Sequence, residues 1–206
     1  MSIMTIGYVQ AASSPTLENR IIYLDPGHGG ADPGTIYKDI HEADINLILA
    51  NKLKTKLENL GATVYLTRYG DYDLSVPYAE NRKRSDLSRR GNIINRSNCD
   101  LYLSIHLNSG SSPSWKGAQV FYDDINSENE KIAKIMQEEL GKALYSNKQY
   151  KLTSEMYLHR RIERPGVLIE VGFLSNPNER YLLQQDDYQE KAADAILAGI
   201  IRYFES

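Results

Sequence analysis

The chain has 206 residues, of which 41% are hydrophobic and 25% are charged, and its formal net charge at pH 7 is −3. This length fits a single domain with a buried core, and the slightly acidic balance argues against a nucleic-acid-binding protein, which normally carries a basic surplus. The single cysteine, Cys99, excludes an intrachain disulfide and is expected to be a small buried side chain. No apolar run reaches the ~18 residues that a transmembrane helix needs.

Residues 1–19 form a mildly apolar start, MSIMTIGYVQAASS, followed by a short polar stretch. A complete signal peptide begins with basic residues and has a longer apolar stretch, whereas here no Lys or Arg precedes Arg20. Two interpretations stay open, namely the remnant of an export or anchor segment and a flexible start. The folded domain is expected to span residues 20–206.

Apolar strands alternate with amphipathic helices along this domain. Strands are expected at residues 21–25, 63–67, 101–107, 117–122 and 166–171, and helices at 42–60, 86–98, 127–145, 178–184 and 188–204. Leucine and isoleucine recur at helical spacing in 42–60, which ends before Gly61, and Ser127 with Glu130 forms a capping-box pattern. The alternation predicts one three-layer α/β/α domain, with helices on both faces of a mostly parallel, roughly six-stranded sheet.

Four polar residues lie where a predicted strand ends or a predicted helix begins. They are His28 in IIYLDPGHGG, Glu42 in HEADINLIL, His106 in LYLSIHLNS and Glu170 in GVLIEVGFLSN. Ligands of such sheets bind at the carboxyl ends of the strands. The predicted fold therefore brings all four residues to one edge of the sheet.

These residue types suit a zinc hydrolase. Catalytic zinc commonly takes three protein ligands from His and Glu and leaves the fourth place to water. Bound zinc lowers the pKa of that water to about 7 and polarises a carbonyl, and a nearby carboxylate can transfer the proton. The pattern favours one Zn²⁺ per chain held by His28, Glu42 and His106, with Glu170 as the catalytic acid/base in amide hydrolysis.

Each of the four residues also has an ordinary structural explanation. A histidine after a strand is more often a hydrogen-bonded rim residue than a ligand, and Glu42 could be a first-turn acid stabilised by the helix dipole. Glu170 ends an apolar run, where an unpaired charge is costly, so a structural role would need a partner that the sequence does not show.

The other two histidines, His41 and His159, are expected to be solvent-exposed, although His159 lies in an arginine-rich loop from which it could contact a substrate. No HExxH pattern is present, which argues against the common zinc-endopeptidase arrangement.

Basic residues gather in two places. One cluster follows the second predicted strand and comprises Arg82, Lys83, Arg84, Arg89 and Arg90; the other precedes the Glu170 strand and comprises Arg160, Arg161 and Arg164. A solvated surface is the ordinary interpretation, and attraction of an anionic polymer is the alternative. We expect Arg89 and Arg164, together with Asn108, to contact the substrate.

The motifs DPGHGG, an acidic residue before DINL, SIHLNS and EVGFLSN occur in this order. They resemble the zinc-dependent N-acetylmuramoyl-L-alanine amidases of the third amidase class, and the resemblance spans roughly residues 21–204. It implies that His28, Glu42 and His106 bind zinc and that Glu170 is the catalytic acid/base. The implied reaction cleaves the amide that joins the lactyl group of muramic acid to L-alanine of the peptidoglycan stem peptide.

Further stretches, including DLSRRGNIINRS, SENEKIAKIMQEEL and EMYLHRRIERPG, resemble the germination-specific amidases of spore-forming bacteria. That subgroup implies an exported enzyme, outside the cytoplasmic membrane between forespore and mother cell, that strips stem peptides from spore cortex as the first step toward muramic-δ-lactam. No cell-wall-binding repeats follow Ser206, so substrate targeting would need the catalytic domain, a membrane anchor or another protein. No autoinhibitory helix is evident between the last strands, which fits the simpler sporulation type, and an activating protein partner could still help to complete the metal site. Two other functions stay open: a zinc peptidase that cuts within the stem peptide, and a peptidoglycan-binding module without activity.

Overall fold

The computed structural model describes residues 16–206, so most of the segment predicted as an export remnant lies outside the described residues. Six strands form one sheet in the order β4-β1-β5-β8-β6-β7. Their bounds are β1 Ile21–Pro26, β4 Thr63–Leu66, β5 Leu101–Asn108, β6 Gln119–Tyr122, β7 Lys151–Leu152 and β8 Gly166–Phe173. Every neighbouring pair is parallel except β6 with β8. A separate two-stranded hairpin is formed by β2, Ile36–Tyr37, and β3, Ile40–His41.

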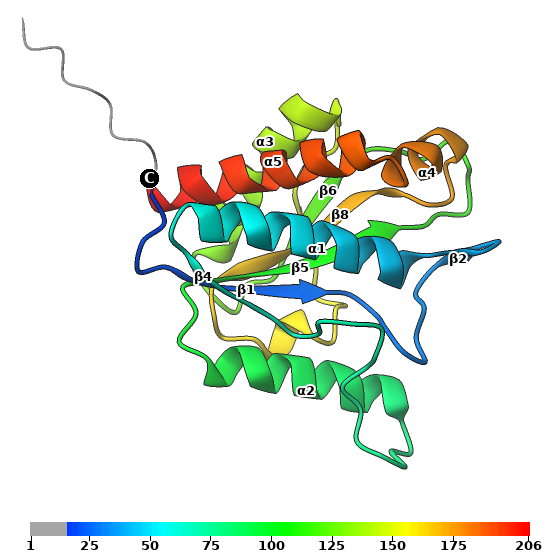
Figure 1. Ribbon diagram of the computed structural model, residues 1–206, viewed down its shortest axis with the longest axis horizontal. Helices are drawn as coiled ribbons and strands as arrows, with labels where there is room; N and C mark the ends of the chain where they lie inside the picture. Colours follow the sequence, from blue (N-terminus) through cyan, green and yellow to red (C-terminus); the bar gives the residue numbers. More distant parts are fainter. Residues whose placement is uncertain (1–15) are drawn as a thin grey trace, which may run out of the picture.

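Helices cover both faces of the sheet (Figure 1). One face carries α1 (Glu42–Asn59), α3 (Asn129–Leu144) and α5 (Asp186–Phe204), and α4 (Pro177–Leu183) follows β8. The other face carries α2 (Arg82–Arg96) and the short 3-10 helix η1 (His159–Arg161). The predicted three-layer α/β/α architecture is confirmed. Within residues 16–206, no helix combines the length and the apolar character needed to cross a membrane.

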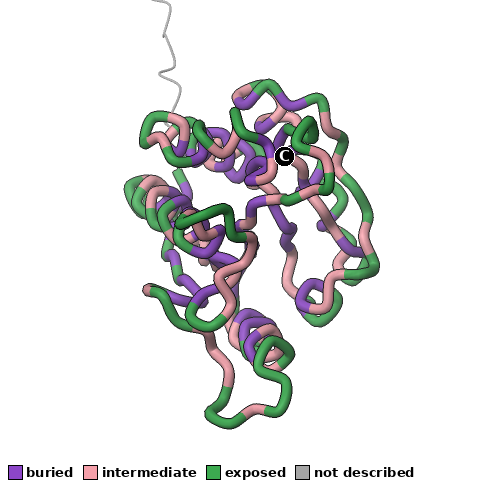
Figure 2. The backbone as a smooth tube through the Cα atoms, turned by 90° about the vertical axis from the view of Figure 1, so that its right-hand side faces the viewer, coloured by how far each residue is buried: buried purple, intermediate pink, exposed green. Residues whose placement is uncertain are grey.

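The two faces of the sheet are packed differently, because successive strand residues point to opposite sides. The face toward α1, α3 and α5 is a continuous apolar core that includes Leu24, Leu103 and Ile169. The α2 face has a smaller apolar cluster around Ile94 and Tyr102, beside buried polar side chains. Figure 2 looks toward the carboxyl ends of the parallel strands, where exposed loops surround the buried centre.

Four helix starts differ from the prediction, among them those of α4 and α5, which begin one and two residues early at Pro177 and Asp186. α2 begins at Arg82 rather than at residue 86, because Asn81 has extended backbone geometry and its side chain accepts a hydrogen bond from the Arg84 N–H at 2.9 Å. α3 begins at Asn129 rather than at residue 127, with no side-chain hydrogen bond at its N-cap, so the predicted capping box is wrong.

Candidate active site and metal centre

Four elements deliver the predicted site residues to the carboxyl edge of the sheet. His28 lies in the glycine-rich turn after β1, and Glu42 is the first residue of α1. His106 lies in β5 and is paired in register with Glu170 on β8. Both side chains therefore point to the same face of the sheet, toward α2. The sequence predicted this convergence from the strand ends and from the start of the first helix.

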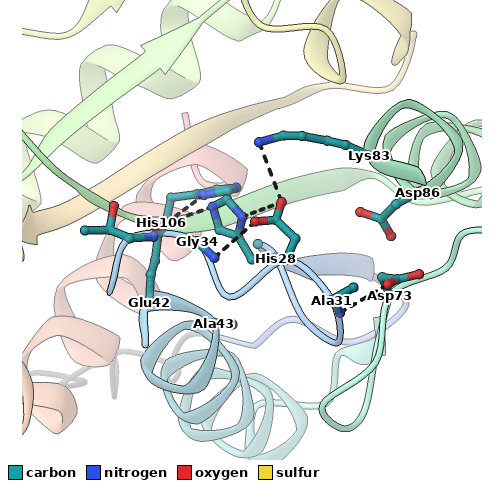
Figure 3. Close-up of polar contacts among 12 residues, drawn as sticks. His28, Ala31, Gly34, Glu42, Ala43, Asp73, Lys83, Asp86 and His106 are labelled. Carbon is teal, nitrogen blue, oxygen red and sulfur yellow. Dashed lines mark hydrogen bonds and ion pairs between the residues drawn. The ribbon is translucent and has the colours of Figure 1, made fainter. Parts of the chain in front are cut away.

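The two imidazoles converge on one oxygen of Glu42 (Figure 3). His28 Nε2 lies 3.2 Å and His106 Nδ1 lies 3.0 Å from Glu42 Oε1. One ligand atom from each of the three residues falls within 4.8 Å of the others, a spacing that can hold a metal ion. Two imidazole nitrogens and a carboxylate are also the donor set that zinc prefers.

The charge balance of the three residues fits a cation-binding group. Burial alone would raise the pKa of Glu42, but the hydrogen bonds from His106 and His28 hold it well below its usual range. Burial would lower the pKa of His28, and its contacts with Glu42 and Asp32 raise it instead. Glu42 is therefore ionised and ready to pair with a positive charge.

Glycines leave the space that the ligand side chains occupy. A Cβ atom on Gly27 would lie 2.1 Å from Cε1 of His106, and one on Gly34 would lie 2.7 Å from Glu42 Oε2 and from His28 Cδ2. Such distances are far inside van der Waals contact, so these positions exclude any side chain. The space left by Gly27 and Gly34 accommodates the side chains of His28, Glu42 and His106, and these residues are suited to hold Zn²⁺.

Neighbouring groups fix the orientation of the candidate ligand side chains His28 and Glu42. Asp32 Oδ2 lies 3.0 Å from His28 Nδ1, which leaves Nε2 facing Glu42. Glu42 Oε2 accepts a hydrogen bond from the Thr35 N–H at 2.9 Å, and Oε1 accepts one from the Leu107 N–H at 3.1 Å. A carboxylate that orients a ligating histidine is a recurrent device of metal sites. Asp32 was not among the predicted site residues, and its only signal in the sequence is its position four residues after His28 in the same turn.

Glu170 is half-buried and differs from the other acids of the site. Its Oε2 is shielded from solvent and has no hydrogen-bond partner within residues 16–206. The pKa of Glu170 is raised to about 7. Burial is the largest cause; the nearby Glu42 carboxylate also raises the pKa, and His106 and His28 lower it in part. A carboxyl group with a pKa near neutrality is suited to both accept and donate a proton. This is the property required of a general acid/base.

An open cleft of about 390 Å³ surrounds these side chains, and its lining includes Asn108 and Lys83 besides the three candidate ligand residues and Glu170. The predicted substrate contact Asn108 thus lies beside the site. The other two do not lie among the cleft residues: Arg89 is exposed on α2, and Arg164 donates to the Asn95 carbonyl at 3.3 Å near the start of β8.

Two expectations about charged residues on the α2 face were wrong. His159 is only 2% exposed, because η1 directs it inward, where its Nδ1 lies 2.8 Å from Tyr102 Oη; burial lowers its pKa to about 4. Arg90 belongs to no solvated surface, since it is 1% exposed and pairs with Asp25 and Asp86, each at 2.9 Å.

Two smaller predictions are confirmed. The His41 side chain is 44% exposed, and Cys99 is buried.

A parallel sheet that gathers a His–Glu–His group and a shielded acid at its carboxyl edge is typical of a metal-dependent hydrolase. Comparison with known proteins narrows this class. The N-acetylmuramoyl-L-alanine amidase family matches residues 22–202, and the germination-specific N-acetylmuramoyl-L-alanine amidase of Bacillus subtilis (strain 168) is 45% identical over 91% of this chain and 81% of that protein. The chain belongs to the N-acetylmuramoyl-L-alanine amidase family.

Solved structures agree in fold. The CwlD amidase from Clostridioides difficile, solved in complex with the GerS lipoprotein, superposes with a TM-score of 0.86 at 38% identity and covers 91% of this chain and 99% of that chain. The catalytic domain of CwlV from Bacillus (Paenibacillus) polymyxa gives a TM-score of 0.80 at 27% identity over 90% and 98% of the two chains. The chain is therefore an enzyme of the amidase class.

Proposed function

We propose that this protein is a zinc-dependent amidase that hydrolyses the bond between the lactyl group of N-acetylmuramic acid and L-alanine of the peptidoglycan stem peptide. The observation that carries the proposal is the convergence of His28, Glu42 and His106 on one point, beside an acid, Glu170, that has no partner of its own within the described chain. His28, Glu42 and His106 would hold the metal, since the nitrogens His28 Nε2 and His106 Nδ1 both face the carboxylate of Glu42.

The chemistry divides between the metal and the chain. Bound Zn²⁺ supplies a Lewis acid that polarises the substrate carbonyl and acidifies water. Glu170 accepts the proton of the attacking water and returns it to the amide nitrogen as that nitrogen leaves. Its raised pKa makes both transfers feasible near neutral pH. Asp32 keeps His28 in one orientation throughout.

The substrate lies in the open cleft, where we propose Asn108 as a polar contact. Arg89 and Arg164 stay predictions, and a role for them requires a substrate that reaches beyond the cleft along the surface. We assign residues 20–206 as the catalytic domain, in agreement with the span of the family match.

The biological setting is the spore cortex, outside the cytoplasmic membrane, where removal of stem peptides is the first step toward muramic-δ-lactam. Support comes from the 45% identity to the germination-specific amidase of Bacillus subtilis. The complex of the Clostridioides difficile CwlD amidase with the GerS lipoprotein supports the further proposal that a protein partner acts on this chain as well. Comparing stem-peptide release by the purified chain with and without an added partner lipoprotein tests that proposal.

Mass spectrometry of digested muropeptides tests the reaction. The zinc-loaded protein should release intact stem peptides that begin with L-alanine. Glu170→Gln should slow this release by about 10²- to 10⁴-fold, the usual contribution of general acid–base catalysis, while one zinc per chain remains bound. Glu163→Gln, which alters an exposed carboxylate ahead of the same strand, is the matched control and should retain activity. Release that survives Glu170→Gln rejects the assigned role.

The same digests separate the two alternative functions. Shortened stem peptides still attached to muramic acid would indicate a peptidase that cuts within the stem. Binding to cortex fragments without turnover, with zinc and other divalent metals, would indicate a binding module. The shielded oxygen of Glu170, which has no partner within residues 16–206, argues against the binding module, because an acid oxygen kept from water without a hydrogen bond costs free energy that binding alone does not require.

A further inference from the structure

Two buried arginines, Arg68 and Arg90, bind the backbone of the turn that carries His28. We infer that both are positioning residues, which hold His28 in its metal-binding conformation before any metal arrives. The inference rests on the proposed zinc site and extends it to residues outside the ligand group. Each arginine is 1% exposed, so water cannot take over the hydrogen bonds that it makes.

Arg90 fixes the turn to α2 and to the sheet. Its Nη2 donates to the carbonyl oxygen of His28 itself at 2.6 Å, and its Nη1 donates to the Pro26 carbonyl at 2.9 Å. The same guanidinium is anchored by Asp86 on α2 and by Asp25 on β1, each at 2.9 Å. The position of His28 is therefore set by two elements at once.

Arg68 fixes the turn to the helix that carries Glu42. Its Nε donates to the Pro26 carbonyl at 3.0 Å, and its Nη2 donates to the carbonyls of Gly27 at 3.0 Å and of Ala43 at 2.7 Å. Ala43 directly follows Glu42 in the first turn of α1. One guanidinium thus joins the backbone just before His28 to the backbone just after Glu42.

The turn needs such support because His28 has a backbone φ of +63°, in the left-handed region. Non-glycine residues adopt this region at a cost and keep it only where their surroundings over-determine it. Three successive carbonyl groups, those of residues 26–28, all accept from these guanidinium groups. The planar fork of arginine can reach several acceptors at fixed angles, whereas a lysine offers three donors from a single point.

A purely structural role for the arginines makes a different prediction. Such residues would lower the stability of the fold when altered, yet the folded fraction would still bind zinc with the affinity of the wild type. A positioning role lowers the affinity of the folded protein itself. Zinc affinity, measured on metal-free folded protein, therefore separates the two roles.

The test uses Arg68→Lys and Arg90→Lys, with Arg96→Lys as the matched control on an exposed part of α2. Zinc is titrated into each metal-free protein against a chromophoric chelator, after circular dichroism has shown that the protein is folded. The two buried-site variants should bind zinc about 10- to 100-fold more weakly, as found when residues that orient metal ligands are altered. Arg96→Lys should match the wild type, and saturating zinc should restore stem-peptide release to the variants.

Wild-type affinity in folded Arg68→Lys and Arg90→Lys would overturn the inference. If Arg90→Lys does not fold, Arg68→Lys decides, because it leaves Asp25 and Asp86 paired with Arg90. A second measurement needs no variant: crystal structures of the wild type without and with zinc should show the same turn and the same left-handed His28. A turn that forms only with zinc would contradict the inference. Failure of the wild type to bind zinc would instead reject the proposed function.

Discussion

Two carboxylates on the α2 side of the sheet, Asp25 and Glu170, line the same cavity and differ in their surroundings. Asp25, in the interior of the sheet, accepts hydrogen bonds from Thr67 at 2.6 Å, Ser104 at 2.8 Å and Arg90 at 2.9 Å. Although burial raises the pKa of Asp25, Arg90 and the hydroxyl groups lower it to about 2. Glu170, at the rim, has a shielded oxygen without a described partner and a pKa raised by burial to about 7.

The difference shows how a carboxyl group can serve either the stability of a fold or its catalytic chemistry. Burial acts in the same direction on both carboxyl groups, and the hydrogen-bond partners decide the outcome. A fully partnered acid holds the structure together and stays ionised. An unpartnered acid costs stability but can exchange protons near neutral pH, which is the condition of catalysis.

Removing the partnered acid should give the largest effect on stability. Asp25→Asn leaves the buried Arg90 with one carboxylate instead of two, and breaking a buried ion pair typically costs about 3 to 5 kcal/mol. Urea unfolding of the metal-free protein should show this loss. An unfolding free energy equal to that of the wild type would mean that Asp25 does not anchor the interior, and the comparison with Glu170 would fail.

Replacing the unpartnered acid should have the opposite sign. The folded pKa of Glu170, about 7, lies above its unfolded value of 4.5, so the wild type loses stability as the pH rises between these values. Glu170→Gln removes this cost and should stabilise the metal-free protein by up to about 3 kcal/mol above pH 7.

Thermal unfolding at pH 8 and at pH 4 measures this difference, which should vanish at the lower pH, where Glu170 is protonated in both the folded and the unfolded state. Glu163→Gln, at an exposed position, should change neither value. A Glu170→Gln protein that is less stable than the wild type at pH 8 would show that the acid has a partner after all.

Acid should expose the contribution of Asp25 in the wild-type protein. Its folded pKa of about 2 lies below the unfolded value of 3.8, so its stabilisation is complete above pH 3.8 and is lost as the pH falls toward 2. The loss attributable to Asp25 is about 2 kcal/mol. Urea unfolding at several pH values should give a shallower dependence for Asp25→Asn than for the wild type, and parallel curves would speak against the assignment.

The smallest predicted effect concerns the N-cap of α2, which contacts neither Asp25 nor Glu170. Asn81→Ala removes the side chain that caps this helix and should cost about 1 kcal/mol, the usual value for a lost N-cap. Zinc affinity should not change, because Arg90 is held by its own ion pairs and not by the helix end. A large drop in affinity would show that the interior network depends on the cap.

The sequence was sufficient for five of the six strands of the sheet and for bringing His28, Glu42 and His106 together. Strands such as β5 and β8 are continuous apolar runs, which a buried parallel sheet requires, and the alternation with helices orders the layers. His28, Glu42 and His106 could be assembled because each follows or precedes such an element. The rule that parallel strands present their carboxyl ends at one edge then supplied the convergence.

The burial of Arg90 and His159 could not be predicted, because it depends on contacts with residues distant in the sequence. Arg90 stands in a basic run that suggests a solvated surface, and its burial depends on Asp25 on another element as well as on Asp86 in the same helix. His159 stands among arginines, and its burial depends on Tyr102 across the fold. Strands β2, β3 and β7 have two residues each, too few for any periodicity to appear.

Cys99 carries a consequence for the environment in which the protein can work. Its side chain is 3% exposed, and burial raises the pKa of the thiol, although a hydrogen bond with Ser97 lowers it. The reactive thiolate form is therefore scarce, and the chain holds no second cysteine to pair with it. No disulfide can form within this chain and oxidants react slowly with this thiol, so Cys99 contributes little sensitivity to redox conditions.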